Sequence, residues 1–555
     1  MTKPNENVPS FNLWTEPWIS LEGDGAVKQH SIRDALLNAY DYVAIYDPSP
    51  LVVVGIHRLL TAVLQDALNP RETSELEQLW KYGKFPADKI KRFEEKYVDR
   101  FDLFSDDKPF FQSADLPMFL DAKAQKANKP KPVAQLFPEI PSGPSLVTHY
   151  RHTTEEEQVF SSATVAAGLV AMPPFVSSGG AGLLPSINGV PPIYVLPGGK
   201  TLFESLAASL ISSTMLEDDY PTTKADWAWW KRPVPMIVQE SRKKRQGMSF
   251  DKHRQLREVG YLHGLTFPAR KVRLHPERLN AVCSRSGQFS EWCVKTMAFR
   301  MGESVVGEKF WRDPFVAYKL PAKEQGAGGK RRLTKTKSKK KDKPNPIRPM
   351  QNRGKAAWRE FTGLFLQQKD GQTLRPRFLD QLSMLSIGER HETYPFRCVA
   401  FQTDGKMKYY EWMDFGFDVP PTLLRDPDGA KWTVEALSFG TNCATTITRV
   451  FSTTFGHKTK RAERFMRIKS RMEEDYWSTL AGKFRQFILA LGDRVRQQQT
   501  LDEWFNTAIH EAQCAFDRAA DATGDGGSTL RQIVMGKAKC HNALQDLRNK
   551  TKQGG

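Results

Sequence analysis

The sequence predicts an α+β protein, with a large, loop-rich mixed α/β N-terminal domain followed by a C-terminal four-helix bundle. Two observations predict this class. Between about residues 104 and 425, glycine and proline are frequent and the helical and strand patterns are short. From about residue 427 onward, apolar residues recur at helical spacing over long stretches. We place the domain boundary at residue 420, which gives domains of residues 1–420 and 421–555.

Short elements are expected in the first hundred residues. Residues 11–23 predict a strand or the start of a hairpin, which Pro17 restricts to the edge of a sheet. Ser31, with Asp34 three residues later, predicts the N-cap of a helix. Pro50 predicts the first turn of a longer helix, because proline is favoured at that position. The expected helices cover residues 31–39, 50–68 and 75–97, the last interrupted near Gly83 and Pro86.

The middle of the chain predicts isolated strands between loops. Residues 193–196 and 399–402 are short apolar runs of the strand type. Residues 398–410 combine a strand, the Asp404-Gly405 turn and a second strand, which is the pattern of a β-hairpin. The many loops without periodicity indicate a body shaped around a partner, although insertion-rich folds give the same pattern.

Four long helices are expected at the C-terminal end, over residues 432–455, 475–495, 500–522 and 529–548. The helix at 475–495 has the clearest apolar spacing of three and four residues. Thr500 and Glu503 have the spacing of a capping box, and Ser528 follows a glycine-rich turn, so we expect the last two helices to begin there. Short links between long helices favour an antiparallel bundle.

The charge of the chain favours a polyanionic partner. The 555 residues carry a formal charge of +18, and the isoelectric point is about 9.4. Residues 330–343 hold nine basic residues and one acid between glycine-rich and proline-rich flanks. This tract is interpreted either as a solvated insertion or as a loop that follows nucleic-acid phosphates, because lysine suits sequence-independent contact with a phosphate backbone.

The absence of complete sequence motifs disfavours several classes of protein. Six cysteines without a CxxC pair are too few for a disulfide scaffold and fit a reducing compartment. No phosphate loop, zincin pair or GxSxG elbow is complete. His275, Cys283 and Cys293 offer three metal ligands where structural zinc takes four, so free buried cysteines and no metal are expected. Without a continuous apolar span or a signal core, we expect a cytoplasmic protein that is not in a membrane.

Several short motifs follow one another along the chain. They are Asn12-Leu13-Trp14 with Trp18-Ile19, Pro109-Phe110-Phe111-Gln112, Ser142-Gly143, Gly179-Gly180, Gly189-Val190-Pro191, and Phe310-Trp311 with Asp313-Pro314. Together with the expected C-terminal bundle, this order resembles the CasA family, the large subunit of the type I-E CRISPR surveillance complex Cascade. The resemblance covers nearly the whole chain.

The resemblance implies a non-catalytic reader of DNA rather than an enzyme, and it implies no cofactor. Members of the family bind the duplex beside a foreign target at the protospacer-adjacent motif (PAM) and open it, so that guide RNA can pair with one strand. The implied partners are the other Cascade subunits with CRISPR RNA, double-stranded target DNA, and the effector nuclease-helicase that the family recruits. The C-terminal bundle of the family helps to hold the displaced strand.

Two family elements that reach the minor groove can be carried over to this sequence. The family's glycine loop matches Gly179, Gly180 and Ala181, where glycine allows the main chain to approach base edges closely. The minor groove presents a degenerate pattern, so such a reader would accept several PAMs. The family's basic finger falls near Arg300, with Lys295 as the second choice. An ordinary glycine-rich turn and surface charges are the alternative interpretations.

Two further elements follow from the same resemblance. The family's strand-separating wedge matches the hairpin tip at Gly405, Lys406 and Met407, although the family usually has glutamine there. Its loop on the 5′ handle of the guide RNA matches residues 144–149, which include Ser145, Leu146, Val147, Thr148 and His149, with Tyr150 as the other aromatic candidate. Some members bind zinc through four cysteines near residues 275–286, but here only His275 and Cys283 are present, so we expect no zinc.

Two other functions remain open at this point. A nucleic-acid-processing enzyme, such as a nuclease with an unrecognised active site, would share the basic charge. A general basic RNA-binding scaffold would share it as well. The nuclease predicts metal-dependent cleavage of DNA, and the scaffold predicts that a substitution at Gly180 hardly changes binding.

Overall fold

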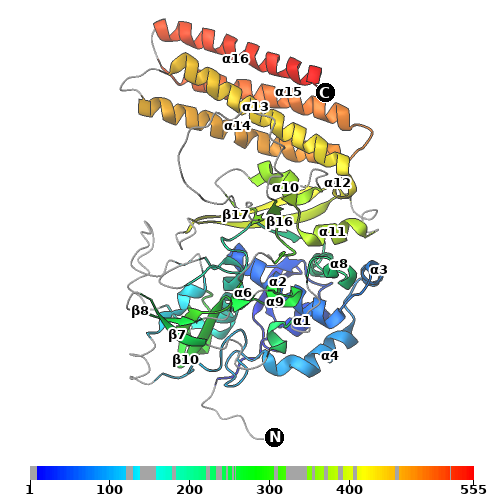
Figure 1. The fold of residues 1–555 in the computed structure, drawn as a ribbon, viewed down its shortest axis with the longest axis vertical. Helices are drawn as coiled ribbons and strands as arrows, with labels where there is room; N and C mark the ends of the chain where they lie inside the picture. The colour runs from blue at the N-terminus through cyan, green and yellow to red at the C-terminus, as the bar shows by residue number, and fades with distance from the viewer. Residues whose placement is uncertain are drawn as a thin grey trace. The chain divides into compact units, whose positions relative to one another are not determined.

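The fold was established from a computed structural model of the chain (Figure 1). It describes residues 9–120, 129–137, 140, 158–177, 183–220, 226–232, 240–245, 248–252, 255–256, 258–305, 311–320, 347–352, 357–367, 373–385, 392–403, 409–456, 462–524 and 527–554. The described part of the chain is mixed α and β, which confirms the predicted fold class. It forms two compact units, one of Met1–Arg353, Arg375–Ile387 and Pro395–Gly416, and one of Gly354–Leu374, Gly388–Tyr394 and Phe417–Gly555.

The helices of the first unit are short, apart from one central core helix. They are α1 (Ile32–Leu37), α2 (Pro50–Leu68), α3 (Thr73–Tyr82), α4 (Ala87–Tyr97), α6 (Ser162–Phe175), α7 (Leu202–Ala208), α8 (Ser213–Glu217), α9 (Tyr261–Leu265) and α11 (Arg377–Met384), with the 3₁₀ turns η1 (Val98–Arg100), η2 (Val133–Leu136) and η3 (Trp229–Lys231). Ser31 caps α1, and its hydroxyl accepts a hydrogen bond from the Asp34 amide, as predicted. The predicted interruption near Gly83 and Pro86 is confirmed, because it separates α3 from α4.

The strands of the first unit form several small sheets rather than one large sheet. They are β1 (Ile19–Gly23), β2 (Ala26–His30), β3 (Ala44–Ile45), β4 (Lys131–Pro132), β5 (Phe160–Ser161), β6 (Tyr194–Pro197), β7 (Glu240–Arg245), β8 (Met248–Lys252), β9 (Gln255–Leu256), β10 (Arg270–Val282), β11 (Phe289–Met301), β12 (Ser304–Val305), β13 (Tyr318–Lys319), β14 (Arg348–Pro349), and most of β16 (Tyr394–Thr403) and β17 (Tyr409–Val419). The longest pair is the antiparallel ribbon β10–β11.

The core of the first unit is built around the contact between α2 and α6. Nearly every residue of α2 is buried, and every residue of α6 except Ala163 is buried as well. Gly55 lets the two helices approach closely, because a Cβ at this position would lie 2.5 Å from the carbonyl oxygen of Val170. This contact fixes the end of α6, which leads into the predicted glycine loop.

Among the described residues, α2 is the one helix that is long and apolar enough to cross a membrane, by length and composition alone. No such segment was predicted from the sequence. In α2, 89% of the most apolar window is buried inside the protein, which is also the property of an ordinary core helix. Its Arg58 makes a buried ion pair with Asp313 at 2.7 Å. We therefore assign α2 to the protein core.

The second unit contains four long helices, α13 (Pro427–Phe455), α14 (Ala462–Leu491), α15 (Gln497–Asp521) and α16 (Gly527–Gly554), together with η4 (Ala357–Glu360), α10 (Phe361–Phe365), α12 (Pro421–Arg425) and β15 (Thr373–Leu374). The long helices pack along one another (Figure 1). Side chains of α14 and α15 donate hydrogen bonds to α13, from Tyr476 Oη to the Gly440 carbonyl at 2.9 Å and from Trp504 Nε1 to the Ala436 carbonyl at 2.8 Å.

Two predicted helix caps in this unit are wrong. Thr500 lies inside α15, which begins at Gln497, so Thr500 and Glu503 do not form the expected capping box. Ser528 likewise lies inside α16. The physical reason at α15 is tertiary, because the buried Gln497 side chain donates to the Asp426 carboxylate at 3.3 Å and extends the helix by one turn. The domain boundary at residue 420 stays a prediction.

Candidate nucleic-acid interface

The β10–β11 ribbon organises the part of the first unit in which the predicted site residues meet. Its register pairs Arg270 with Met301 at one end and Val282 with Phe289 at the other. β10 occupies one edge of β11, and the short strands β4 and β5 pair with the opposite edge. The outer edge of β11 therefore carries two other chain segments between Cys293 and Met297.

Of the predicted site residues, Lys295 and Arg300 are described, and both lie on β11 with half-buried side chains. The other predicted site residues lie outside the described residues. These are the glycine loop (Gly179, Gly180, Ala181), the wedge tip (Gly405, Lys406, Met407), the guide-handle loop (Ser145 to His149) and the basic tract at 330–343. The residues that flank each of these segments, which we call its stems, are described. The stems define where each segment leaves and rejoins the fold.

The stems of the glycine loop are tied together by one buried arginine at the start of β10. The Arg270 guanidinium donates to the Ser177 carbonyl at 3.0 Å and to the Leu184 carbonyl at 2.7 Å. The Leu184 amide in turn donates to Met301 Sδ at 3.3 Å, and the Ser186 amide donates to the Val176 carbonyl at 2.9 Å. Arg270 was not predicted from the sequence, because nothing in the residues around a single strand arginine indicates that it holds the two ends of a loop.

Arg300 and Lys295 lie at different places on the ribbon. Arg300 is the residue before Met301, and its register partner is Lys271, a buried lysine that makes an ion pair with Asp115. Arg300 is thus at the end of the ribbon that holds the glycine-loop stems. Lys295 is five residues earlier, which is about 17 Å along a strand. The structure therefore separates two residues that sequence reasoning treated as alternatives for one role.

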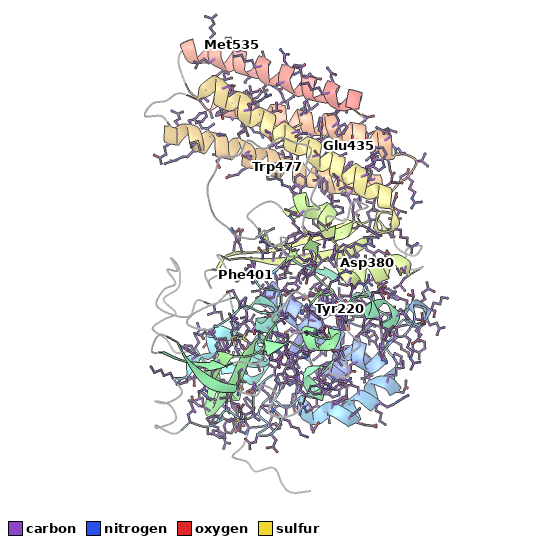
Figure 2. The ribbon with its side chains drawn as sticks, in the orientation of Figure 1. Tyr220, Asp380, Phe401, Glu435, Trp477 and Met535 are labelled. Carbon is purple, nitrogen blue, oxygen red and sulfur yellow. The ribbon has the colours of Figure 1, made fainter. Side chains whose placement is uncertain are left out.

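The strands of the predicted wedge hairpin are present on both sides of the undescribed tip. β16 pairs with β6 and with β17, and Arg397 on β16 makes a bidentate ion pair with Asp414 on β17 at 2.8 and 2.7 Å. Phe401 on β16, labelled in Figure 2, contacts Phe175 at the end of α6 with ring centroids 6.4 Å apart. The strand that leads to the wedge tip therefore packs against the helix that leads to the glycine loop.

The stems of the guide-handle segment lie on the other half of the ribbon. β4 precedes the segment and pairs with Thr296 and Met297, whereas β5 follows it and pairs with Cys293 and Val294. Lys295 lies between these two pairings on the same edge of β11. The chain between β4 and β5 thus leaves and rejoins one edge of one strand.

The potential metal ligands His275, Cys283 and Cys293 do not form a cluster that could hold a metal ion. His275 Nδ1 is 3.1 Å from Thr296 Oγ1, and burial together with the nearby Arg273 lowers the pKa of His275 to about 4. Burial alone would raise the pKa of the Cys283 thiol, but hydrogen bonds with Ser286 and Thr164 outweigh burial and lower this pKa to about 7. Among the described residues, no group of three or more potential ligands is close enough to hold a metal ion.

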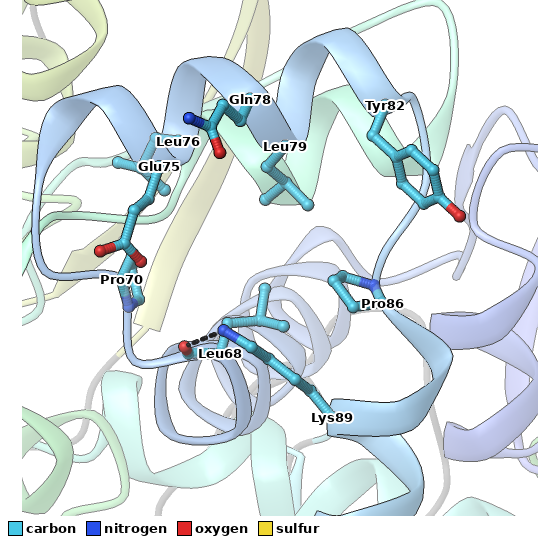
Figure 3. Close-up of a pocket in the computed structure, with 9 residues that line it drawn as sticks. All are labelled: Leu68, Pro70, Glu75, Leu76, Gln78, Leu79, Tyr82, Pro86 and Lys89. Atoms are coloured by element: carbon cyan, nitrogen blue, oxygen red, sulfur yellow. Dashed lines mark hydrogen bonds between the residues drawn. The ribbon is translucent and has the colours of Figure 1, made fainter.

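Two further features were not anticipated from the sequence. The β7–β8 hairpin is basic, and its register places Lys243, Lys244 and Arg245 opposite the neutral residues Phe250, Ser249 and Met248. The run of four basic residues from position 242 was the available signal. A surface pocket of about 360 Å³ lies between α3 and the ends of α2 and α4, where Lys89 Nζ donates to the Leu68 carbonyl at 3.0 Å (Figure 3). No predicted site residue lines this pocket.

Comparisons with known proteins agree on one family. The sequence model of the CRISPR-associated protein Cse1 family matches residues 12–514. A CRISPR-associated protein CasA/Cse1 from Thermus thermophilus is 28% identical over 557 residues, which cover 98% of both chains. The crystal structure of Cse1 from Acidimicrobium ferrooxidans has a TM-score of 0.74 and 20% identity, and the match covers 98% of this chain and 99% of that one. A chain from a CRISPR RNA-guided surveillance complex has a TM-score of 0.66 and 16% identity, with 97% and 99% covered.

Proposed function

Because this chain belongs to the CRISPR-associated protein Cse1 family, we propose that it is the large, non-catalytic subunit of an RNA-guided CRISPR surveillance complex. It recognises the PAM of double-stranded DNA from the minor groove, starts strand separation for R-loop formation and recruits the effector nuclease-helicase. Its partners are the sister subunits, CRISPR RNA and target DNA, in the cytoplasm. The fold match to a chain of an RNA-guided surveillance complex supports the assembly.

The observation that carries the DNA-reading part of this proposal is the convergence of three stems. Arg270 holds both stems of the glycine loop, the β11 end with Arg300 lies beside them, and Phe175 contacts Phe401 on the wedge strand. Base-edge contact and strand opening have to act on neighbouring base pairs, so the segments that perform them have to leave the fold close together. The same observation favours Arg300 over Lys295 as the finger in the minor groove.

The proposed division of labour has a physical basis. Pairing with guide RNA reads the long target sequence, so the protein needs to read only a short motif and to begin melting. A glycine main chain and an arginine suit the minor groove, which is narrow and presents mainly acceptors. Unstacking one base step costs on the order of a few kcal/mol, which contacts with phosphates offset. The bundle at residues 421–555 helps to hold the displaced strand.

Gly180→Asp tests the proposal in the complex co-purified with guide RNA. Binding is measured to a duplex library randomised beside the target. We expect a large loss of binding for every accepted PAM, because the new carboxylate clashes with and repels the groove. The matched control is Ser74→Asp, which adds the same charge at an exposed position in the first turn of α3, outside the segments proposed to contact DNA.

The competing functions give different results in the same experiment. A general RNA-binding scaffold predicts that Gly180→Asp and Ser74→Asp bind DNA alike. A nuclease predicts cleavage of DNA by the purified protein with Mg²⁺ or Mn²⁺, and abolition of that cleavage by substitution of one carboxylate. Either result rejects the proposal that the protein recognises DNA without catalysing a reaction on it.

A further inference from the structure

We propose that the pocket between α3 and the ends of α2 and α4 is a docking site for a basic segment of the effector nuclease-helicase, which inserts one large apolar side chain there. This inference rests on the proposed function, because that function supplies the partner. It goes further in assigning recruitment to one surface and in stating the chemistry of the segment that binds. All the residues that line the pocket belong to the first unit (Figure 3).

The inner surface of the pocket is apolar. Leu76 and Leu79 of α3 and Leu68 at the end of α2 are buried and line it, and Pro70 and Pro86 line it as well. The volume of about 360 Å³ is at the low end of the range of about 300–1,000 Å³ for ligand pockets. Such a volume suits one large apolar side chain of a partner, which is the usual anchor at the centre of a protein interface.

The walls of the pocket are fixed by contacts within the first unit. The Ser213 amide donates to the Pro70 carbonyl at 2.8 Å. Gly83 ends α3 in the left-handed conformation with φ = 75°, and Phe85 packs on Phe203 of α7 with ring centroids 4.9 Å apart. A pocket whose walls are already fixed loses little conformational entropy when a side chain enters it, so even a small contact area can contribute to affinity.

The charge around the pocket favours a basic protein segment over a nucleic acid. Residues 72–79 hold three glutamates and no basic residue, although the chain as a whole carries +18. The exposed Glu75 lines the pocket, and its carboxylate makes no ion pair or hydrogen bond with the other described residues. Lys89 also lines the pocket, but its ammonium donates to the Leu68 carbonyl at 3.0 Å (Figure 3). Carboxylates repel phosphates and attract lysine or arginine, so we expect a cation beside the apolar anchor.

The rim of the pocket indicates a partner that binds after the complex has assembled. Tyr82 is 63% exposed at the rim, and Gln78 and Glu75 are exposed as well. Interfaces between permanently associated subunits are larger and more apolar, whereas transient partners use small, polar-rimmed contacts. In the proposed function the sister subunits are permanent partners, and the nuclease-helicase is recruited to the assembled complex. The polar rim therefore favours the nuclease-helicase.

The test measures capture of the purified nuclease-helicase by the assembled complex, with guide RNA and a target duplex that carries an accepted PAM. Gln78→Trp fills the pocket with an indole from an exposed position of α3, so that no buried side chain is changed. We expect it to weaken capture about tenfold. The matched control is Lys81→Trp, which adds the same indole at an exposed position of α3 that does not line the pocket. It should stay within about twofold.

Glu75→Gln tests the charge of the partner segment. We expect it to weaken capture about threefold at low salt and hardly at all at high salt, because the attraction between exposed ions is screened. Gln78→Trp should lose the same factor at both salt concentrations. The control is Glu22→Gln, which removes the same charge from an exposed position on β1 and should leave capture unchanged. Binding of the target duplex should be unchanged in all four variants.

Four outcomes overturn the proposal or one of its parts. If Gln78→Trp captures the nuclease-helicase as the unchanged protein does, or if Lys81→Trp loses as much, the pocket is not the docking site. If Gln78→Trp instead weakens binding of the protein to the guide-loaded remainder of the complex, the pocket belongs to a sister subunit. If Glu75→Gln has no effect at low salt, the segment is not basic. Failure of the proposed function is distinguishable, because then the complex with the unchanged protein would not capture the nuclease-helicase.

Discussion

Arg270 illustrates how one buried side chain joins segments that are far apart in the sequence. Its guanidinium satisfies carbonyl groups of Ser177 and Leu184, which flank the predicted glycine loop, and its strand partner is Met301. A loop that reads DNA through its main chain has to be held by its ends, because it has no side chains of its own to fix it. Arg270 is the residue that provides this support.

Arg270→Lys is expected to weaken PAM-dependent DNA binding by roughly tenfold, because an ammonium group cannot bridge two carbonyls as a planar guanidinium does. The measurement is the affinity of the assembled complex for duplexes with and without an accepted PAM. The control is Arg273→Lys, which changes a buried arginine of the same strand that donates to the Ser105 carbonyl at 3.0 Å. Both variants should lower the melting temperature. Equal loss of PAM-dependent binding in both would show that Arg270 acts only through stability.

At the same scale, the resemblance placed Arg300 ahead of Lys295, but the residue pattern itself could not choose between them. Both are basic residues on one strand, and a local pattern does not reveal which neighbour a strand residue meets. The choice depends on the register of β11 with β4, β5 and β10, which is set by pairing between distant segments. The residue pattern could not assign the finger because it contains no information about which distant strands pair with β11.

At the scale of elements, helix interiors were easier to predict than helix ends. The apolar face of α14 is confirmed from Trp477 to Leu491, but the helix begins at Ala462 and not at residue 475. Its first part is strongly charged, which hid the helical pattern. Phe465 nevertheless stacks on Phe451 of α13 with ring centroids 5.4 Å apart, and Glu463 makes an ion pair with Arg467 one turn later. Packing against a neighbour extended the helix beyond what periodicity showed.

The second unit also contains the 3₁₀ turn η4, which lies before the predicted domain boundary at residue 420. Trp358 of η4 packs against Phe484 and Trp477 of α14, with ring centroids 4.8 and 5.6 Å apart (Figure 2 labels Trp477). Arg359 lies over the Trp477 ring at 3.8 Å. A short segment from before residue 420 thus completes the bundle. It could not be predicted from the pattern of the four consecutive helices, because it is far from them in the sequence.

Trp358→Ala is expected to destabilise the second unit by about 3–5 kcal/mol, because it removes a buried indole and leaves a cavity between aromatic rings. The measurement is urea unfolding followed by far-ultraviolet circular dichroism, in which the long helices dominate. Trp412→Ala is the matched control, since this tryptophan of β17 is 43% exposed. A Trp358→Ala protein that unfolds at the same urea concentration as the Trp412→Ala protein would contradict this role.

At the scale of the whole molecule, the sequence predicted the class of the fold and the existence of long C-terminal helices. It did so because composition and periodicity are averaged over many residues, and single errors cancel. The clamp at Arg270 depends on a few contacts between distant residues, so no average reveals it. The net charge is again a global property, and it leads to a prediction that concerns the molecule as a whole.

The tract at residues 330–343 carries nine of the basic residues and one acid. If it contacts only phosphates, replacing it with a neutral glycine-serine linker of equal length should weaken DNA binding for all PAMs alike. It should also flatten the plot of log affinity against log salt, since each lost phosphate contact reduces the slope by about 0.9. The measurement is binding of the assembled complex to duplexes with different PAMs between low and moderate salt. A linker variant that loses affinity for one PAM and keeps it for another would assign the tract to base reading, because uniform phosphate attraction cannot distinguish between motifs.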